Sequence, residues 1–176
     1  AHPEALEPKQ FNGEAIGAPF TARQLQEKCR LRLSKEPVWL TEKMVFLGEI
    51  PQLHDFEQRQ SFSAGSDPVD LVLDDTALVY CGTDGLFVIT GCSHSGICNI
   101  IEYAKQVCGE VKIQGIIGGW HLFKVDERLE KTIAYLQKNN IQELYPCHCC
   151  SFKAKAAVHV QIPIQEIGVG KKLIIT

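Results

Sequence analysis

Three histidines stand out in this sequence because they recur at a constant spacing. His94, His121 and His148 are separated by 27 residues and then by 27 residues again. Imidazole is a common protein ligand for zinc, it also binds iron, and it exchanges protons near neutral pH. Three such side chains brought together would form a metal site or a site for acid–base chemistry.

Each histidine lies in a short segment rich in Gly, Cys or Pro that follows an apolar run. The apolar runs predict strands, and helical periodicity follows each segment. The predicted strands cover 86–90, 112–117 and 142–145, and the predicted helices run to about residue 108, over 126–139 and over 153–159. Such strand–helix units favour parallel strands with right-handed crossovers, and ligands bind beyond the carboxyl ends of these strands. The three histidines are therefore expected to converge at one edge of a sheet.

The neighbouring residues indicate different roles for the three histidines. We predict that His94 and His148 are metal ligands, and that Cys92 is a third ligand because a thiolate can bind or bridge a metal. His121 is predicted to act in catalysis by contacting the substrate, with direct ligation of the metal as the alternative. For Cys92 the alternative is a small residue packed at a strand end.

Three residues near the histidines are predicted to bind substrate, and a fourth to support a ligand. Gly118 and Gly119 would let the backbone approach a bound group without a clashing side chain, and Ser93 lies between the two predicted ligands Cys92 and His94. Asp75 could orient a ligating histidine from behind, or it could belong to a polar turn.

The cysteines next to His148 offer a competing interpretation. Cys147, Cys149 and Cys150 could form a structural zinc site, but adjacent residues seldom all reach one ion, and the sequence lacks the pair of Cys-x-x-Cys motifs that is usual for such sites. Cys29, Cys81, Cys98 and Cys108 lie in apolar or helical patterns and are predicted to be small buried residues. We expect reduced thiols and a cytoplasmic protein.

Two regions of the chain differ in their predicted secondary structure. Residues 1–68 are predicted to be irregular, with a short helix over 23–33 capped by Thr21 and a lid-like loop over 48–68. Residues 69–176 are predicted to form an α/β unit. Further predicted strands cover 38–40, 44–47, 71–73, 77–81, 162–167 and 172–175.

Composition excludes several classes of partner. The 176-residue chain has a net charge of −3, which gives no electrostatic reason for nucleic-acid binding. No apolar run approaches the roughly 18 residues needed to span a membrane. The first residues lack the basic and apolar stretches of a signal peptide. We expect a small-molecule substrate, no nucleic acid and no membrane.

Four motifs together resemble the metallo-β-lactamase superfamily, in its branch of beta-lactamase superfamily II metal-dependent hydrolases. They are Asp-Asp-Thr-Ala-Leu at 74–78, Thr-Gly-Cys-Ser-His-Ser-Gly at 90–96, Gly-Gly-Trp-His-Leu at 118–122 and Pro-Cys-His-Cys at 146–149. Some relatives in this branch are named 7,8-dihydropterin-6-methyl-4-(β-D-ribofuranosyl)-aminobenzene-5′-phosphate synthases. The resemblance extends through 48–51 and 55–57, so it covers nearly the whole chain.

The resemblance implies an α/β fold, the αββα sandwich, with a mixed sheet and a dinuclear metal site. It implies hydrolysis by metal-activated water of a phosphorylated or pterin-like small molecule. The metal would be a divalent cation, zinc in the first place, with iron or manganese as alternatives. His94 and His148 would be ligands within this site.

The chain also departs from the family pattern. The family's His-x-His-x-Asp-His motif, which supplies most metal ligands, is absent, so the chain resembles the C-terminal half of the fold. Cys92 stands where the superfamily often has Asp, and Cys150-Ser151 where relatives tend to have Thr-Gly. We expect little hydrolysis by the isolated chain, and pairing with a missing N-terminal half or a homodimer partner. The alternative is a non-catalytic metal-binding or assembly half-domain.

Overall fold

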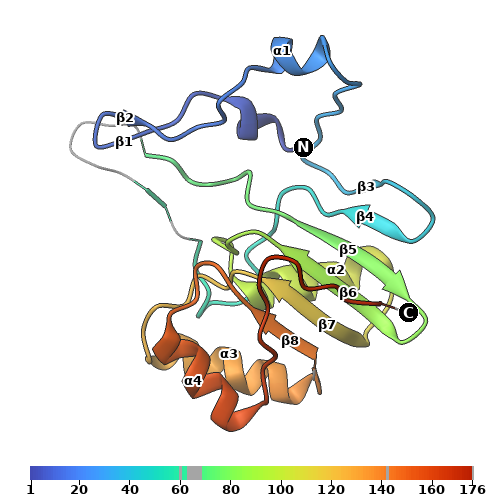
Figure 1. Ribbon diagram of the computed structural model, residues 1–176, viewed down its shortest axis with the longest axis vertical. Helices are drawn as coiled ribbons and strands as arrows, with labels where there is room; N and C mark the ends of the chain where they lie inside the picture. Colours follow the sequence, from blue (N-terminus) through green and yellow to red (C-terminus); the bar gives the residue numbers. More distant parts are fainter. Residues whose placement is uncertain (60, 63–68, 142, 176) are drawn as a thin grey trace.

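A six-stranded mixed sheet is the centre of the computed structural model, which describes residues 1–59, 61–62, 69–141 and 143–175 (Figure 1). The strand order is β3-β4-β5-β6-β7-β8. The strands are β3 (Val38–Trp39), β4 (Met44–Phe46), β5 (Ala77–Gly82), β6 (Gly85–Thr90), β7 (Ile113–Gly118) and β8 (Glu143–Pro146). The pairs from β3 to β6 are antiparallel, and β6, β7 and β8 are parallel. The predicted α/β class with strand–helix units and a mixed sheet is thus confirmed.

Three helices alternate with the parallel strands. They are α2 (Ile97–Cys108), α3 (Glu127–Lys138) and α4 (Phe152–Gln161). Helix α2 buries Ile97, Ile100, Ile101 and Ala104, the helical spacing of one face, against β5, β6 and α3. It ends at Gly109, whose φ of 66° suits the left-handed position that closes a helix. No helix in the described part of the chain is long and apolar enough to span a membrane.

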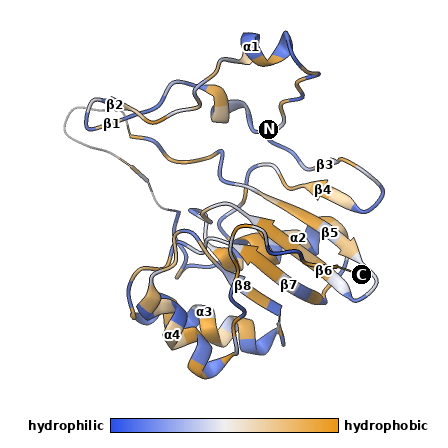
Figure 2. Ribbon diagram, in the orientation of Figure 1, coloured by the Kyte–Doolittle hydropathy of each residue, from blue (hydrophilic) through white to orange (hydrophobic). Residues whose placement is uncertain are grey.

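The core lies where these helices cover the sheet. Val79, Val88, Ile116 and Leu144 face one another across four adjacent strands, and each is fully buried. Burying one such side chain stabilises a fold by roughly 1.5–3 kcal/mol. Figure 2 shows the corresponding concentration of apolar residues along β5 to β8. This row fixes the register of the strands that carry the histidine loops, because a slip by one residue would turn it outward.

The N-terminal region contributes short elements. They are the 3₁₀ turn η1 (Pro3–Leu6), the strands β1 (Gln10–Phe11) and β2 (Glu14–Ala15), and the helix α1 (Ala22–Gln26). The predicted helix over 23–33 is too long. Thr21 does form a capping box with Gln24, but α1 has no buried residue, so no packing extends it. The predicted division at residue 68 remains a prediction. The strands β3 and β4, which precede residue 68, pair into the same sheet as β5.

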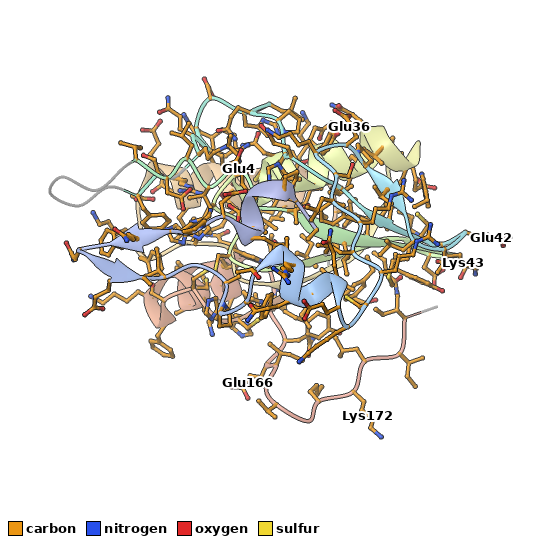
Figure 3. All side chains as sticks on the ribbon, turned by 90° about the horizontal axis from the view of Figure 1, so that it is seen from above. Glu4, Glu36, Glu42, Lys43, Glu166 and Lys172 are labelled. Carbon is orange, nitrogen blue, oxygen red and sulfur yellow. The ribbon has the colours of Figure 1, made fainter. Side chains whose placement is uncertain are left out.

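Some predicted strands are absent from the structure. Residues 71–73, 162–167 and 172–175 form no strand, and the described C-terminal tail has a single backbone bond to β8, from the Gln165 amide to the Leu144 carbonyl. Without a partner strand, an alternating pattern does not become a ladder. Glu166 and Lys172 on this tail point outward, as do Glu42 and Lys43 (Figure 3). The predicted loop over 48–68 includes residues 60 and 63–68, and the predicted strand over 142–145 includes residue 142; these positions lie outside the described residues.

Candidate metal centre

The parallel register brings three loops to one edge of the sheet. Ile89 pairs with Ile117 and Gly118 pairs with Pro146, so β6, β7 and β8 end side by side. His94, His121 and His148 follow the last residues of these strands by four, three and two positions, respectively. The expected convergence of the three strand ends is therefore observed.

The three loops share an uncommon backbone conformation. Ser93, His121 and His148 have φ values of 58°, 49° and 52°, in the left-handed region that non-glycine residues rarely adopt. Such residues persist only where their surroundings hold them, and they concentrate at functional sites. Here the buried Ser93 hydroxyl donates to the Gly119 carbonyl oxygen at 2.6 Å, which ties the first loop to the second.

Two thiols and one imidazole form a compact group of metal-binding atoms. One ligand atom from each of Cys92, His148 and Cys149 lies within 4.8 Å of the other two. The Cys149 thiol also donates to the Cys92 carbonyl oxygen at 3.3 Å. Ligands around tetrahedral zinc lie roughly 3.3–3.8 Å apart, given zinc–ligand bonds of about 2.0–2.3 Å. The donor set therefore fits a thiolate-binding divalent cation without large rearrangement.

Both grouped thiols are protonated in the absence of a cation. Burial, together with the neighbouring Cys149, raises the pKa of the Cys92 thiol to about 11. Burial also raises the pKa of Cys149. Since a metal binds thiolates, its binding here must release protons, and metal affinity rises with pH.

His94 and His121 form a separate pair beside this group. Their ring centroids lie 4.3 Å apart, and Phe62 and Phe123 pack edge-on against them at 5.1 and 4.9 Å. The Nδ1 atoms of both histidines are buried and lack a hydrogen-bond partner within the described ranges. Burial lowers the pKa of His94, and burial with the nearby His94 and Arg128 charges lowers the pKa of His121 to about 4. Both rings are therefore neutral at pH 7, the form that binds metal or accepts a proton.

Asp75, predicted to support a ligand, and Gly118 and Gly119, predicted to bind substrate, lie where the loops of the site pack together. The buried Asp75 carboxylate accepts the backbone N–H of Ser95 at 2.8 Å, and it has no hydrogen bond to an imidazole among the residues described. A Cβ on Gly119 would lie 2.5 Å from the Cys149 sulfur, and one on Gly118 would lie 2.2 Å from the Thr90 carbonyl oxygen. These glycines thus allow adjoining loops to pack closely. Substrate binding by Ser93, Gly118 and Gly119 remains a prediction.

The structure changes the expected grouping of site residues. Of the predicted ligands, Cys92 and His148 lie together, whereas His94 lies against His121. Cys149 joins the group although the sequence suggested it only within the alternative cysteine cluster. Its sole sequence signal is its place directly after His148. Arg128, at the wall of a cavity beside His121, carried no sequence signal at all.

Comparisons with curated proteins support the motif resemblance, although no protein-family model matches the chain. An uncharacterized protein of Methanocaldococcus jannaschii is 32% identical over 158 residues, which are 88% of this chain and 59% of that protein. The 7,8-dihydropterin-6-methyl-4-(beta-D-ribofuranosyl)-aminobenzene-5′-phosphate synthase of the same organism is 32% identical over 131 residues, which are 70% of this chain and 45% of that enzyme. The chain thus spans less than two thirds of the curated relatives it matches.

A solved structure gives the same answer at the level of the fold. It is the crystal structure of a protein described as a metal-dependent hydrolase of the beta-lactamase superfamily, and it superposes with a TM-score of 0.78 at 24% sequence identity. The match covers 98% of this chain and 69% of that one. The resemblance drawn from the motifs is thereby confirmed in three dimensions: the chain has the fold of a beta-lactamase-superfamily metal-dependent hydrolase.

Proposed function

We propose that this chain carries part of the metal site of a metal-dependent hydrolase. The observation that supports the proposal most directly is the grouping of Cys92, His148 and Cys149 beyond the ends of parallel strands. Three protein donors leave one tetrahedral position open, which is typical of catalytic zinc sites. Structural zinc sites instead have four protein ligands.

The donor chemistry favours zinc. Soft thiolates with imidazole select zinc over manganese, while iron remains an alternative. A bound divalent cation would supply a water of lowered pKa and would polarise the scissile bond. Cys92, His148 and Cys149 would hold this cation, and His94 would serve a second cation in a dinuclear site. The neutral imidazole of His121 would accept a hydrogen bond or a proton from the substrate or its attacking water.

We further propose a phosphorylated or pterin-like small molecule as the substrate. Support comes from the name of the synthase relative from Methanocaldococcus jannaschii, which refers to a dihydropterin and a 5′-phosphate. Turnover would need ligands beyond this chain, either from a further polypeptide segment or from a second copy. The chain matches only part of each relative, and the His-x-His-x-Asp-His motif is absent from its sequence. A non-catalytic metal-binding half-domain is the competing function.

Zinc affinity of matched variants tests the site. A competition titration with a chromogenic chelator should find about one tightly bound zinc per chain in the wild type. Cys149→Ser should weaken binding by at least tenfold, because it removes one of three donors. Cys147→Ser is the matched control, since this thiol lies two residues away and is outside the group. Equal zinc affinity in the two serine variants would rule out the proposed ligand set.

A second comparison tests the imidazole and separates a hydrolase from a binding module. His148→Ala should also lose zinc by at least tenfold, whereas His159→Ala on α4 should not. A polypeptide that carries the His-x-His-x-Asp-His segment of a relative should then restore zinc-dependent hydrolysis of bis-p-nitrophenyl phosphate to the wild type and not to His148→Ala. Zinc binding without any restored hydrolysis would favour the half-domain function.

A further inference from the structure

A cavity of about 280 Å³ opens beside the histidine pair. It is lined by His121, Leu122, Phe123, Lys124, Asp126 and Arg128. Two of these side chains carry a positive charge and one a negative charge. The Asp126 carboxylate is already engaged, because it accepts the backbone N–H of Leu129 at 3.1 Å and caps helix α3. The cavity therefore has an excess of positive charge next to a predicted catalytic residue.

Arg128 has unused hydrogen-bonding capacity at the wall of this cavity. Its Nε and Nη2 atoms are buried, and neither has a hydrogen-bond partner in the described part of the chain. These two nitrogens form one edge of the guanidinium group, the edge that donates two parallel hydrogen bonds to two oxygens of one anion. Leaving such donors unsatisfied is unfavourable, so their arrangement calls for a partner. The long side chain can turn this edge into the cavity by rotation about its terminal bonds.

Glu57 offers a second explanation for the two buried nitrogens of the half-buried Arg128. This carboxylate is fully buried, and the Arg128 charge lowers its pKa against the larger effect of burial. However, Glu57 Oε2 accepts the backbone N–H of Asn99 at 3.0 Å, Glu57 Oε1 is buried without a hydrogen-bond partner, and no ion pair joins Glu57 to Arg128 among the described residues. Because the two groups do not meet, charge compensation for Glu57 leaves the donating edge of Arg128 without a hydrogen-bond partner in the described part of the chain.

We propose that Arg128, assisted by Lys124, forms a subsite in this cavity for a phosphate group. A phosphate carries about −1.5 to −2 charges at pH 7, which suits two cations better than a single carboxylate would. A phosphate held here would place the attached molecule beside His121 and toward the thiol–imidazole group. The subsite's part in substrate recognition rests on the proposed hydrolase function, but phosphate binding can be tested without metal.

Titration of the purified chain with inorganic phosphate, in the presence of EDTA, tests the proposal. Binding is followed by ³¹P NMR and by the phosphate-dependent rise of the unfolding temperature. Wild type should bind phosphate saturably, and Arg128→Gln should bind at least tenfold more weakly. Lys131→Gln is the matched control, because Lys131 is an exposed cation on the same helix that pairs with Glu127. Lys131→Gln should bind phosphate as the wild type does.

Three further measurements sharpen the test. Arg128→Lys keeps the charge and the fold but loses the two-nitrogen edge, so it should bind phosphate about threefold more weakly. Glu57→Gln should keep phosphate binding, since Glu57 is not part of the subsite. Acetate should bind at least tenfold more weakly than phosphate to the wild type.

The proposal is overturned if Arg128→Gln or Arg128→Lys binds phosphate like the wild type. It is also overturned if Glu57→Gln abolishes binding, if acetate matches phosphate, or if phosphate shows no saturable binding. Because EDTA is present throughout, these results do not depend on the zinc titrations. Failure of the subsite and failure of the proposed metal site are therefore separate outcomes.

Discussion

The imidazole rings of His94 and His121 lie 4.3 Å apart at an interplanar angle of 51°, although they belong to loops after different strands. Neither Nδ1 atom has a hydrogen-bond partner among the residues that the structure describes. Two neutral rings with free nitrogens next to a thiol–imidazole group constitute a second set of donors. This relationship leads to the first prediction.

His94→Ala should remove a second, weaker equivalent of zinc and leave the first equivalent bound. The reason is that His94 lies outside the group formed by Cys92, His148 and Cys149. Isothermal titration of zinc into the apo chain measures both equivalents. His159→Ala should retain the wild-type isotherm, and loss of both equivalents in His94→Ala would show that His94 belongs to the first site.

Gly119→Ala should disturb the metal site and the fold together. The added Cβ would lie 2.5 Å from the Cys149 sulfur and 2.7 Å from the Gly91 carbonyl oxygen. Overpacking of this kind costs about 1–3 kcal/mol, and displacement of the sulfur should weaken zinc binding about tenfold. Urea unfolding and zinc competition measure the two effects. Gly91→Ala, whose Cβ would meet no atom within 4 Å, should behave like the wild type.

Gly96→Ala should destabilise the chain by about 3 kcal/mol. Gly96 has φ +95°, and a Cβ there would lie 2.4 Å from a Glu57 carboxylate oxygen, so backbone strain and steric overlap act together. The change in urea midpoint measures the effect. Gly168→Ala is the control because its Cβ would meet open space. Equal midpoints for the two variants would contradict the close packing of Glu57 against this helix start.

Glu57 should make stability depend on pH. Burial raises its pKa above the ordinary glutamate value of 4.5, so the folded state keeps the proton to a higher pH than the unfolded state does. The stability due to the protonated form is therefore complete below pH 4.5 and is lost as pH rises through the folded pKa. Glu57→Gln removes this titration, and its stability should change less between pH 4.5 and 8.

Urea unfolding across that pH range measures the predicted difference. Glu130→Gln, which changes an exposed carboxylate on α3, should keep the wild-type pH dependence. If the free energy of unfolding of Glu57→Gln changed with pH as steeply as that of the wild type, other groups would cause the pH dependence of stability.

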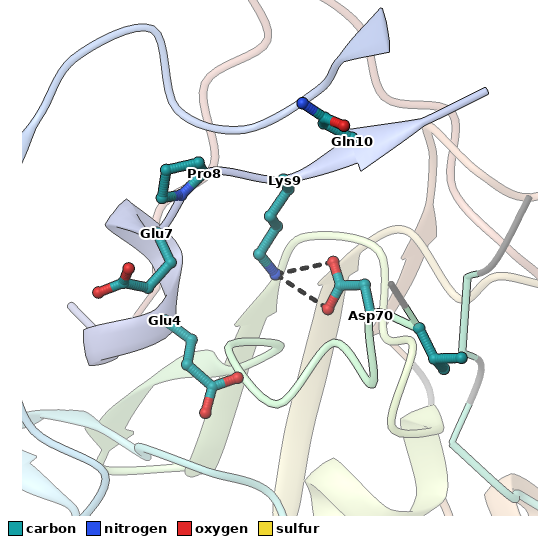
Figure 4. A pocket seen from close by; sticks show the side chains of 7 residues that line it. Glu4, Glu7, Pro8, Lys9, Gln10 and Asp70 are labelled. Carbon is teal, nitrogen blue, oxygen red and sulfur yellow. Dashed lines mark hydrogen bonds and ion pairs between the residues drawn. The ribbon is translucent and has the colours of Figure 1, made fainter. Parts of the chain in front are cut away.

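Lys9→Met should loosen the N-terminal region without unfolding the sheet. The Lys9 ammonium contacts a carboxylate oxygen of Asp70 at 3.0 Å, as Figure 4 shows, and one of Asp74 at 2.6 Å. These partly buried pairs link the segment before β1 to the turn that precedes β5. Limited proteolysis should cleave residues 1–20 several-fold faster in Lys9→Met, whereas Lys28→Met should be cut at the wild-type rate. Equal rates would show that other contacts hold this segment.

The sequence predicted the strand–helix units well because their apolar periodicity matches their burial. The face of α2 that contains Ile97, Ile100, Ile101 and Ala104 is buried as its spacing indicated. The helix over 23–33 and the strands of the tail failed for one shared reason. Their patterns satisfy local propensity, but tertiary contacts decide whether such short segments become regular elements.

The candidate site was predictable only in part. The constant spacing of the histidines predicted that their loops would meet, because that spacing approximates one strand–helix unit. It could not predict that His94 would pair with His121 instead of joining Cys92 and His148. That arrangement depends on left-handed backbone at Ser93, His121 and His148, which no residue type there demands. Arg128 lies near the site only because α3 begins beside the second loop.

His94, His121 and His148 follow the ends of their strands by four, three and two residues. The segment between strand end and histidine therefore shortens by one residue from each loop to the next. This graded spacing distinguishes two kinds of insertion. Residues added within α2 or α3 lengthen the connection between two parallel strands and leave the segments between strand end and histidine unchanged. A single residue inserted between Thr90 and His94 would shift His94 relative to His121 and His148. Natural variants of this protein should therefore differ in helix length and agree, residue for residue, in these three short loops.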